Sequence, residues 1–193
     1  MIFGENGTGK EHIAHHLHDK SKRAGKPFVA VDCGSLTKEL APSAFFGHVK
    51  GAFTGADSTK KGYFYEAEGG TLFLDEVGNL ALETQQMLLR AIQERRYRPI
   101  GDKSDRSFNV RIIAATNEDL EAAVSEKRFR QDLFYRLHDF GITVPPLRDC
   151  QEDILPLAEF FREIANKELE CNVSGFSSEA RKALLTHAWP GNV

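Results

Sequence analysis

The sequence lacks any apolar run that approaches the ~20 residues needed to span a bilayer. It does not open on a basic stretch followed by a long apolar run, so no secretory signal is expected. Its three cysteines, Cys33, Cys150 and Cys171, are odd in number and form no C-x-x-C pair, which argues against a disulfide framework and a zinc site. These absences predict a soluble cytoplasmic protein with reduced thiols.

Neither positive nor negative charge is in large excess. The chain has 25 Lys and Arg against 28 Asp and Glu, a formal net charge of −3, which gives no general attraction to nucleic acid. Any DNA contact would need a local basic patch or a domain outside this chain. With 193 residues, of which 41% are hydrophobic, the sequence is long enough for one well-cored domain and a small appendage.

Short apolar runs alternate with helical patterns along most of the chain. Strands are expected at 28–31, 71–74, 110–115 and 142–144, and helices at 11–21, 83–95 and 120–137. This alternation is typical of an α/β fold with a mainly parallel sheet and helices on both faces. After Pro145 and Pro146, residues 154–164 and 177–187 predict two amphipathic helices of a small all-helical subdomain, the second capped by Ser177 or Ser178.

A glycine-rich turn near the N-terminus fits the pattern G-x-x-x-x-G-K with the residues Gly4, Glu5, Asn6, Gly7, Thr8, Gly9 and Lys10. In that pattern glycines let backbone N–H groups surround a phosphate, and the lysine reaches the outer phosphates. The following helix would point its positive N-terminal end at the same anion. The usual Ser or Thr after the lysine is replaced by Glu11. The alternative is an ordinary glycine-rich turn before a helix.

A second motif ends a predicted strand with two carboxylates, Asp75 and Glu76. In this arrangement the first carboxylate can hold Mg²⁺ and the second can orient an attacking water. Ligands of parallel sheets bind at the carboxyl ends of the strands, where both motifs are expected to lie. The alternative is a strand followed by an acidic turn.

A third motif, GAFTGA, consists of Gly51, Ala52, Phe53, Thr54, Gly55 and Ala56. It is a glycine-flanked loop that presents one large apolar side chain and one hydroxyl, which suits contact with a partner. The alternative is a hairpin whose phenylalanine folds back into the core. The string is the surface-loop signature of the bacterial sigma-54-dependent transcriptional activators, and the chain resembles the central AAA+ ATPase domain of this NtrC-like enhancer-binding protein family.

The resemblance extends over nearly the whole chain and implies roles for individual residues. It implies a P-loop NTPase (AAA+) core at 1–147, with its first strand truncated, and a partial helical lid at 148–193. The residues that it assigns to ATP binding are Gly4, Glu5, Asn6, Gly7, Thr8, Gly9, Lys10, Glu11, Ala67, Glu68, Gly69, Gly70, Thr71, Leu72, Phe73, Leu74, Asp75 and Glu76. Those that it assigns to catalysis are Lys10, Asp75 as the Mg²⁺ ligand, Glu76, Asn117 as phosphate sensor, and the arginine fingers Arg130 and Arg136.

The activity implied by the resemblance is ATP hydrolysis that remodels the sigma-54 RNA polymerase holoenzyme for open-complex formation, with residues 51–56 touching sigma-54. Fingers that act on a neighbour's nucleotide imply a homo-oligomeric ring, a hexamer or heptamer. DNA binding would belong to a C-terminal domain absent here, and no membrane contact is expected. Two rival interpretations are a nucleotide-gated interaction module without turnover and another AAA+ remodelling ATPase, such as a clamp or helicase loader.

The chain departs from the family pattern at several positions. Asp32 stands where the family has an asparagine that restrains the catalytic glutamate, and ionised Glu76 would repel it if the two lie close. The family's second sensor arginine would follow Val193, so hydrolysis by this chain is expected to be impaired. Weaker patterns are a histidine cluster at 12–18, more typical of a solvated helix face than of a metal site, and a basic stretch at 95–106 that predicts a hairpin.

Overall fold

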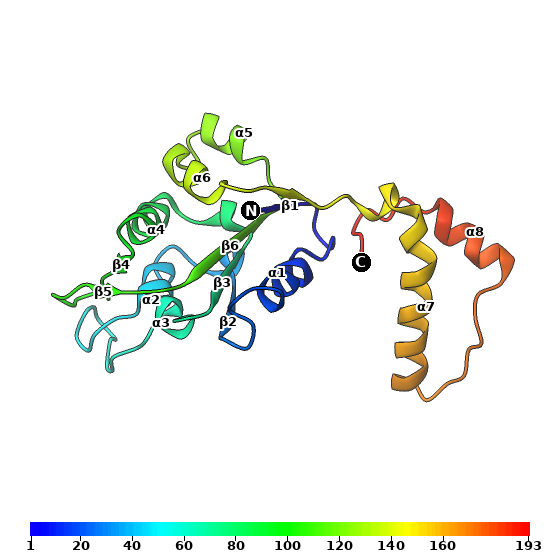
Figure 1. The fold of residues 1–193 in the computed structure, drawn as a ribbon, viewed down its shortest axis with the longest axis horizontal. Coiled ribbons are helices and arrows are strands. Elements are labelled where there is room, and N and C mark those ends of the chain that lie inside the picture. The colour runs from blue at the N-terminus through cyan, green and yellow to red at the C-terminus, as the bar shows by residue number, and fades with distance from the viewer. The chain divides into compact units, whose positions relative to one another are not determined.

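A computed structural model describes all 193 residues and divides them into two compact units. The α/β unit comprises residues 1–3 and 10–143, and the lid unit comprises residues 4–9 and 144–193. Figure 1 labels the helices and strands of both. No helix combines the length and the apolar character that crossing a membrane requires.

Five parallel strands form the sheet of the α/β unit in the order β2-β3-β6-β1-β7 (Figure 1). Their bounds are β1 (Ile2–Phe3), β2 (Phe28–Asp32), β3 (Thr71–Asp75), β6 (Arg111–Thr116) and β7 (Ile142–Thr143). The inner strand β3 is buried from Thr71 to Leu74, as expected for a parallel strand covered on both faces. The expected parallel α/β sheet is therefore confirmed.

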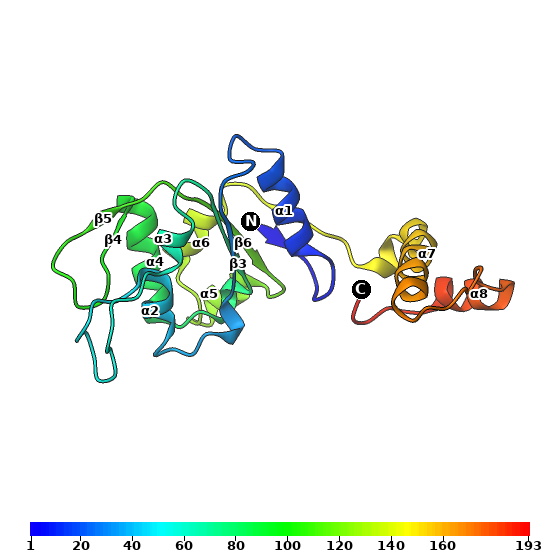
Figure 2. The same cartoon turned by 90° about the horizontal axis from the view of Figure 1, so that it is seen from below.

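Helices cover both faces of this sheet. Helix α1 (Lys10–Asp19) packs against β1, β3 and β6, whereas α6 (Gln131–Leu137) packs against β6 and α4 (Leu82–Glu94) against α6. Figure 2 shows α1 on one side of the strands and α4 and α6 on the other. Two short helices, α2 (Ala41–Phe46) and α3 (Tyr63–Glu66), pack on each other. A 3-10 turn follows each of the strands β2 and β3: η1 (Cys33–Ser35) after β2 and η2 (Val77–Asn79) after β3.

The single helix expected at 120–137 is wrong, because the structure has two, α5 (Leu120–Ser125) and α6. Helix α5 ends at a turn in which Lys127 adopts a left-handed conformation, with φ 60°. The amides of Arg128 and Phe129 both donate to the carbonyl of Ala123, which closes the turn. Phe129 is buried there, so tertiary packing overrides a continuous helical pattern.

An aromatic cluster joins α2, α3 and the hairpin of β4 (Arg96–Tyr97) and β5 (Arg106–Ser107). The ring of Phe64 stacks on Phe46 with centroids 5.5 Å apart and lies 5.7 Å from Tyr97 and 4.7 Å from Phe108. All four side chains are buried. The antiparallel β4–β5 pair confirms the hairpin expected from the basic stretch.

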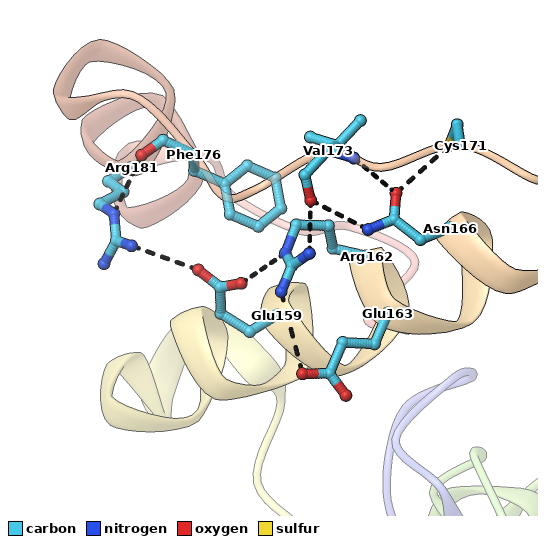
Figure 3. A network of polar contacts seen from close by, with 8 residues as sticks. All are labelled: Glu159, Arg162, Glu163, Asn166, Cys171, Val173, Phe176 and Arg181. Carbon is cyan, nitrogen blue, oxygen red and sulfur yellow. Dashed lines mark hydrogen bonds and ion pairs between the residues drawn. The ribbon is translucent and has the colours of Figure 1, made fainter.

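The lid unit contains η3 (Leu147–Asp149), α7 (Gln151–Glu168) and α8 (Ser178–Thr186), which confirms the expected helical subdomain. Ser177 is the N-cap of α8, and its hydroxyl accepts from the amide of Ala180. Figure 3 shows how side chains of α7 hold the connection between the two helices: Asn166 bonds both backbone polar groups of Val173, and Arg162 donates to the Val173 carbonyl. Glu159 accepts from Arg162 and from Arg181 of α8.

Candidate functional site

Four predicted site residues lie at or next to the ends of elements of the α/β unit. Asp32 and Asp75 are the last residues of β2 and β3 and are paired in register, and Asn117 directly follows β6. Lys10 is the first residue of α1 and is only 7% exposed. The carboxyl ends of parallel strands and the N-terminus of a helix are the places where α/β proteins bind anionic ligands.

The backbone turns sharply after Asp75. Glu76 adopts a left-handed conformation, with φ 51° and ψ 44°, and its amide donates to Asp75 Oδ1 at 3.0 Å. A residue with a side chain is uncommon in this region, and such strain clusters at functional sites. The turn presents both carboxylates half-buried at the end of β3.

The carboxylate of Glu76 has a partner that the sequence reasoning missed. Asn79 Nδ2 donates to Glu76 Oε2 at 2.8 Å, whereas Asp32 Oδ1 accepts from the amide of Gly34 at 2.8 Å. A Cβ built on Gly34 would lie 2.7 Å from Glu76 Oε2 and 3.2 Å from Asp32 Oδ1, so both carboxylates border the same glycine. Asp32 and Glu76 therefore lie beside the same glycine, and each carboxylate accepts from another donor.

Cys33 follows Asp32 and is 1% exposed. Burial raises the pKa of its thiol, and the neighbouring carboxylates of Asp32, Asp75 and Glu76 raise it further. A thiol in this environment stays protonated and is a poor nucleophile. Cys33 therefore serves packing at this site rather than covalent chemistry.

The glycine-rich turn of residues 4–9 packs against the end of the chain within the lid unit. Gly7 and Gly9 have positive φ angles of 75° and 79°, which glycine adopts without steric cost. Asn192 Nδ2 donates to the carbonyl of Asn6 at 2.8 Å, and the amide of Val193 donates to the carbonyl of Gly7 at 3.1 Å. The C-terminal residues thus hold two carbonyls of this turn in place.

Glu5 of the same turn forms a two-bond ion pair with Arg148 in η3. The two guanidinium nitrogens lie 2.5 and 2.8 Å from the carboxylate oxygens. This pairing lowers the pKa of Glu5 from 4.5 to about 2. Sequence reasoning placed both residues in family motifs but had no signal for their contact, because 143 positions separate them.

Replacing Arg148 by glutamine is expected to return the pKa of Glu5 toward 4.5, because the neutral amide no longer favours the ionised carboxylate. A lowered native pKa stabilises the fold above the unfolded pKa, and the contribution is lost as the pH falls from about 4.5 to about 2. The measurement is an NMR titration of the Glu5 carboxyl carbon, with Arg148→Lys as the charge-retaining control. An unchanged titration midpoint in Arg148→Gln would contradict the pairing.

Gln85 of α4 is fully buried and holds the turn that precedes the predicted finger Arg130. Its Nε2 donates to the carbonyls of Leu80 and Arg128 at 2.7 and 3.0 Å, and its Oε1 accepts from the amide of Arg130 at 2.8 Å. A glutamine on the apolar face of a predicted helix is the pattern that could have indicated this structural role. The sequence reasoning missed it.

Gln85→Glu is expected to lower the free energy of unfolding by about 2–4 kcal/mol, because a carboxylate cannot donate to the two carbonyls and is costly to bury. Urea unfolding measures the change. The neighbouring exposed Gln86→Glu is the matched control and should stay within about 0.5 kcal/mol of the native chain. Equal effects at the two positions would contradict the role of Gln85.

The two predicted fingers lie at opposite ends of α6. Arg130 is its N-cap residue, and Asp132 accepts from its guanidinium at 3.0 and 2.7 Å. Arg136, in the last turn, borders a hollow of about 450 Å³ that Met1 and Phe140 also line. Neither guanidinium forms an ion pair with Asp75 or Glu76, so within one subunit the structure does not bring the fingers to these carboxylates.

The GAFTGA residues lie in the probe loop, residues 48–60, which ends on a backbone bridge between His48 and Lys60. Phe53 is 47% exposed, and its ring meets the edge of the His48 ring with centroids 5.0 Å apart. The alternative in which this phenylalanine folds into the core is therefore wrong. Val49 donates to the carbonyl of Ile100 and Ile100 donates to that of Gly47, which joins the probe loop to the β4–β5 hairpin.

Two of the four histidines of α1 contact the sheet, whereas His12 and His16 are exposed. His15 stacks on Phe28 at 3.8 Å, and His18 Nδ1 bonds Thr71 Oγ1 at 2.9 Å in a buried position. No group of three or more His, Cys, Asp or Glu side chains is placed to hold a metal ion.

Comparison with known proteins agrees with this architecture. The Sigma-54 interaction domain family matches residues 1–143, and the AAA+ ATPase lid domain family matches residues 148–193. The chain is 49% identical over its full length to the transcriptional regulatory protein ZraR of Klebsiella oxytoca, of which it covers 44%. Crystal structures of NtrX from Brucella abortus with ADP and with ATP superpose with TM-scores of 0.92 and 0.91 at 36% identity, covering all of this chain and 42% and 41% of those chains.

The chain therefore belongs to the sigma-54 interaction domain family and carries an adjoining AAA+ lid. It is a AAA+ P-loop NTPase domain of the kind found in bacterial sigma-54-dependent transcriptional regulators, which confirms the family resemblance. It spans less than half the length of the curated relatives described above.

Proposed function

We propose that this chain is the ATP-hydrolysing core of a transcriptional activator that remodels the sigma-54 RNA polymerase holoenzyme and so allows open-complex formation. The observation that carries the proposal is the turn after β3, where Asp75 and Glu76 are held half-buried by left-handed backbone at residue 76. Family membership and the ADP and ATP complexes of Brucella abortus NtrX support it.

The residues present fit ATP and Mg²⁺. Gly7 and Gly9 have the positive φ angles that a phosphate-wrapping backbone needs, and Lys10 supplies a positive charge at the helix N-terminus. Asp75 offers the hard carboxylate oxygen that Mg²⁺ prefers. Bound Mg²⁺ would neutralise phosphate charge during transfer.

The roles proposed for the protein groups follow from their chemistry. Glu76 accepts a proton from the attacking water, and Asn117 donates a hydrogen bond to the terminal phosphate. Residues 4–11 and 67–76 bind the nucleotide. Arg130 and Arg136 stabilise the charge of the transferring phosphoryl group on a neighbouring subunit, so activity requires a homo-oligomeric ring. We propose a AAA+ core at 1–147 and a lid at 148–193, with DNA binding in a further domain.

The decisive experiment measures ATP turnover against protein concentration for the native chain, Arg130→Ala and Glu76→Gln, alone and mixed. The rate per subunit of the native chain is expected to rise with concentration, and each variant alone should be inactive. The mixture should regain turnover, because an Arg130→Ala subunit keeps its glutamate and borrows the partner's finger. Arg90→Ala, an exposed arginine on α4, is the matched control. Tight ATP binding without turnover, both in this chain and in a version extended through the family's second sensor arginine, would instead favour a nucleotide-gated interaction module.

Phe53→Ala is expected to reduce binding to isolated sigma-54 at least about tenfold, because an exposed aromatic anchor commonly dominates a small interface. Its ATP turnover should stay close to that of the native chain. Phe140→Ala removes a ring that is 74% exposed elsewhere and is the control. Unchanged sigma-54 affinity in Phe53→Ala would contradict the role of the probe loop.

A further inference from the structure

The amide of Asn79 holds the carboxylate of Glu76 through a short local turn. The backbone amide of Asn79 donates to the carbonyl of Glu76 at 2.9 Å, and its side-chain Nδ2 donates to Glu76 Oε2 at 2.8 Å. Left-handed backbone at Glu76 followed by η2 brings residue 79 back over residue 76. One residue thus fixes both the main chain and the side chain of the glutamate.

Asp32, on the neighbouring strand, cannot do the same. An ionised carboxylate has no hydrogen to donate, and Asp32 Oδ1 already accepts from the amide of Gly34. Its charge also opposes the charge of Glu76 across Gly34. A neutral amide on the other side, from Asn79, can hold the glutamate without adding charge.

Gly34 leaves the space in which this bond forms. A Cβ at this position would lie 2.7 Å from Glu76 Oε2, closer than real Cβ contacts come, and 3.0 Å from Asn79 Nδ2, which is tighter than most of them. The glycine ends no strand and has no positive φ, so backbone conformation does not require it. A glycine at this position is explained by the side chains of Glu76 and Asn79, which meet where a Cβ would lie.

We propose that Asn79 is the positioning residue for Glu76 in ATP hydrolysis, an inference that rests on the proposed ATPase function. The bond to Oε2 limits the rotation of the carboxylate. Oε1 is then left to accept the proton of the attacking water, which needs a base held within hydrogen-bond reach.

The test uses Asn79→Ala and Asn79→Asp in the full chain, at protein concentrations where the native rate per subunit no longer rises. Both variants are expected to lower kcat about 10- to 100-fold, the usual effect of a hydrogen bond to a charged group. The KM for ATP and the affinity for fluorescently labelled ADP should stay within about twofold.

Asn172→Asp is the matched control, since it makes the same chemical change at an exposed site in the lid unit. Native kcat in both Asn79 variants would overturn the inference and leave the ATPase proposal standing. A parallel loss of labelled-ADP affinity and kcat would also overturn it, because Asn79 would then be structural. Binding of labelled ADP without turnover at any concentration, both in this chain and in a version extended through the family's second sensor arginine, would overturn the ATPase proposal and this inference together.

Discussion

Glu76→Gln is expected to lower the rate of ATP turnover about 10²- to 10⁴-fold, the range typical of a lost general base. Glutamine keeps the size of the side chain, and its carbonyl oxygen can still accept from Asn79, so the turn after β3 has no reason to change. The lost property is the ability to take a proton from water. Affinity for ATP should therefore remain near the native value.

Phosphate release and equilibrium binding of labelled ATP measure the two quantities separately. Glu83→Gln, an exposed acid in the first turn of α4, is the control and should turn over ATP at the native rate. Turnover within about threefold of native in Glu76→Gln would remove Glu76 from the proposed chemistry. Equal losses of affinity and rate would indicate that the substitution disturbs nucleotide binding.

Phe64→Ala should produce the largest loss of stability, about 3–5 kcal/mol in the free energy of unfolding. The ring is fully buried and contacts Phe46, Tyr97 and Phe108, so its removal leaves a cavity bounded by three other rings. A loss of this size is a large part of the 5–15 kcal/mol typical of a folded domain. The variant should be partly unfolded near physiological temperature.

Urea unfolding followed by circular dichroism measures this loss. The adjacent Tyr65→Ala removes a ring that is 44% exposed and should change stability far less. Phe46 precedes the probe loop, Tyr97 lies in β4, and Phe108 directly follows β5. Faster amide exchange at residues 48–60 in Phe64→Ala is therefore expected before global unfolding. A loss below about 1 kcal/mol would show that the cluster repacks around the gap.

The strands and most helices could be predicted from sequence because their signals are local. Continuous apolar runs at 28–31 and 71–74 predict buried parallel strands, and the structure has β2 and β3 there, each one residue longer. Burial is confirmed for β3 but is wrong for β2, which lies at the sheet edge and is buried only at Val31. The break between α5 and α6 could not be predicted in the same way. It depends on Gln85, distant in sequence, which binds the carbonyl of Arg128 and the amide of Arg130.

In the candidate site too, local motifs could be predicted from sequence and side-chain contacts could not. Motif patterns located Lys10, Asp75 and Glu76, because those patterns are short and contiguous. They gave no sign of the Asn79 bond to Glu76 or of the Arg148 bond to Glu5, which depend on side-chain direction and on the folded path of the chain. The exposure of Phe53 was likewise open from sequence, since a glycine-flanked loop can turn its aromatic residue either way.

The hydrogen bonds between the probe loop and the β4–β5 hairpin complete a connection from the turn after β3 to the loop that carries Phe53. The connection runs through η2, α4 and the hairpin. From Glu76 the chain runs through η2 directly into α4, whose 13 residues make a rod about 20 Å long. The rod ends at the hairpin, where Ile100 bonds to Gly47 and Val49 at the base of the probe loop. Helix α4 contacts β4 as well as α6, so a shift of the Glu76 turn would reach the hairpin through one continuous helix. The helix would then connect the turn after β3 to the base of the loop that exposes Phe53.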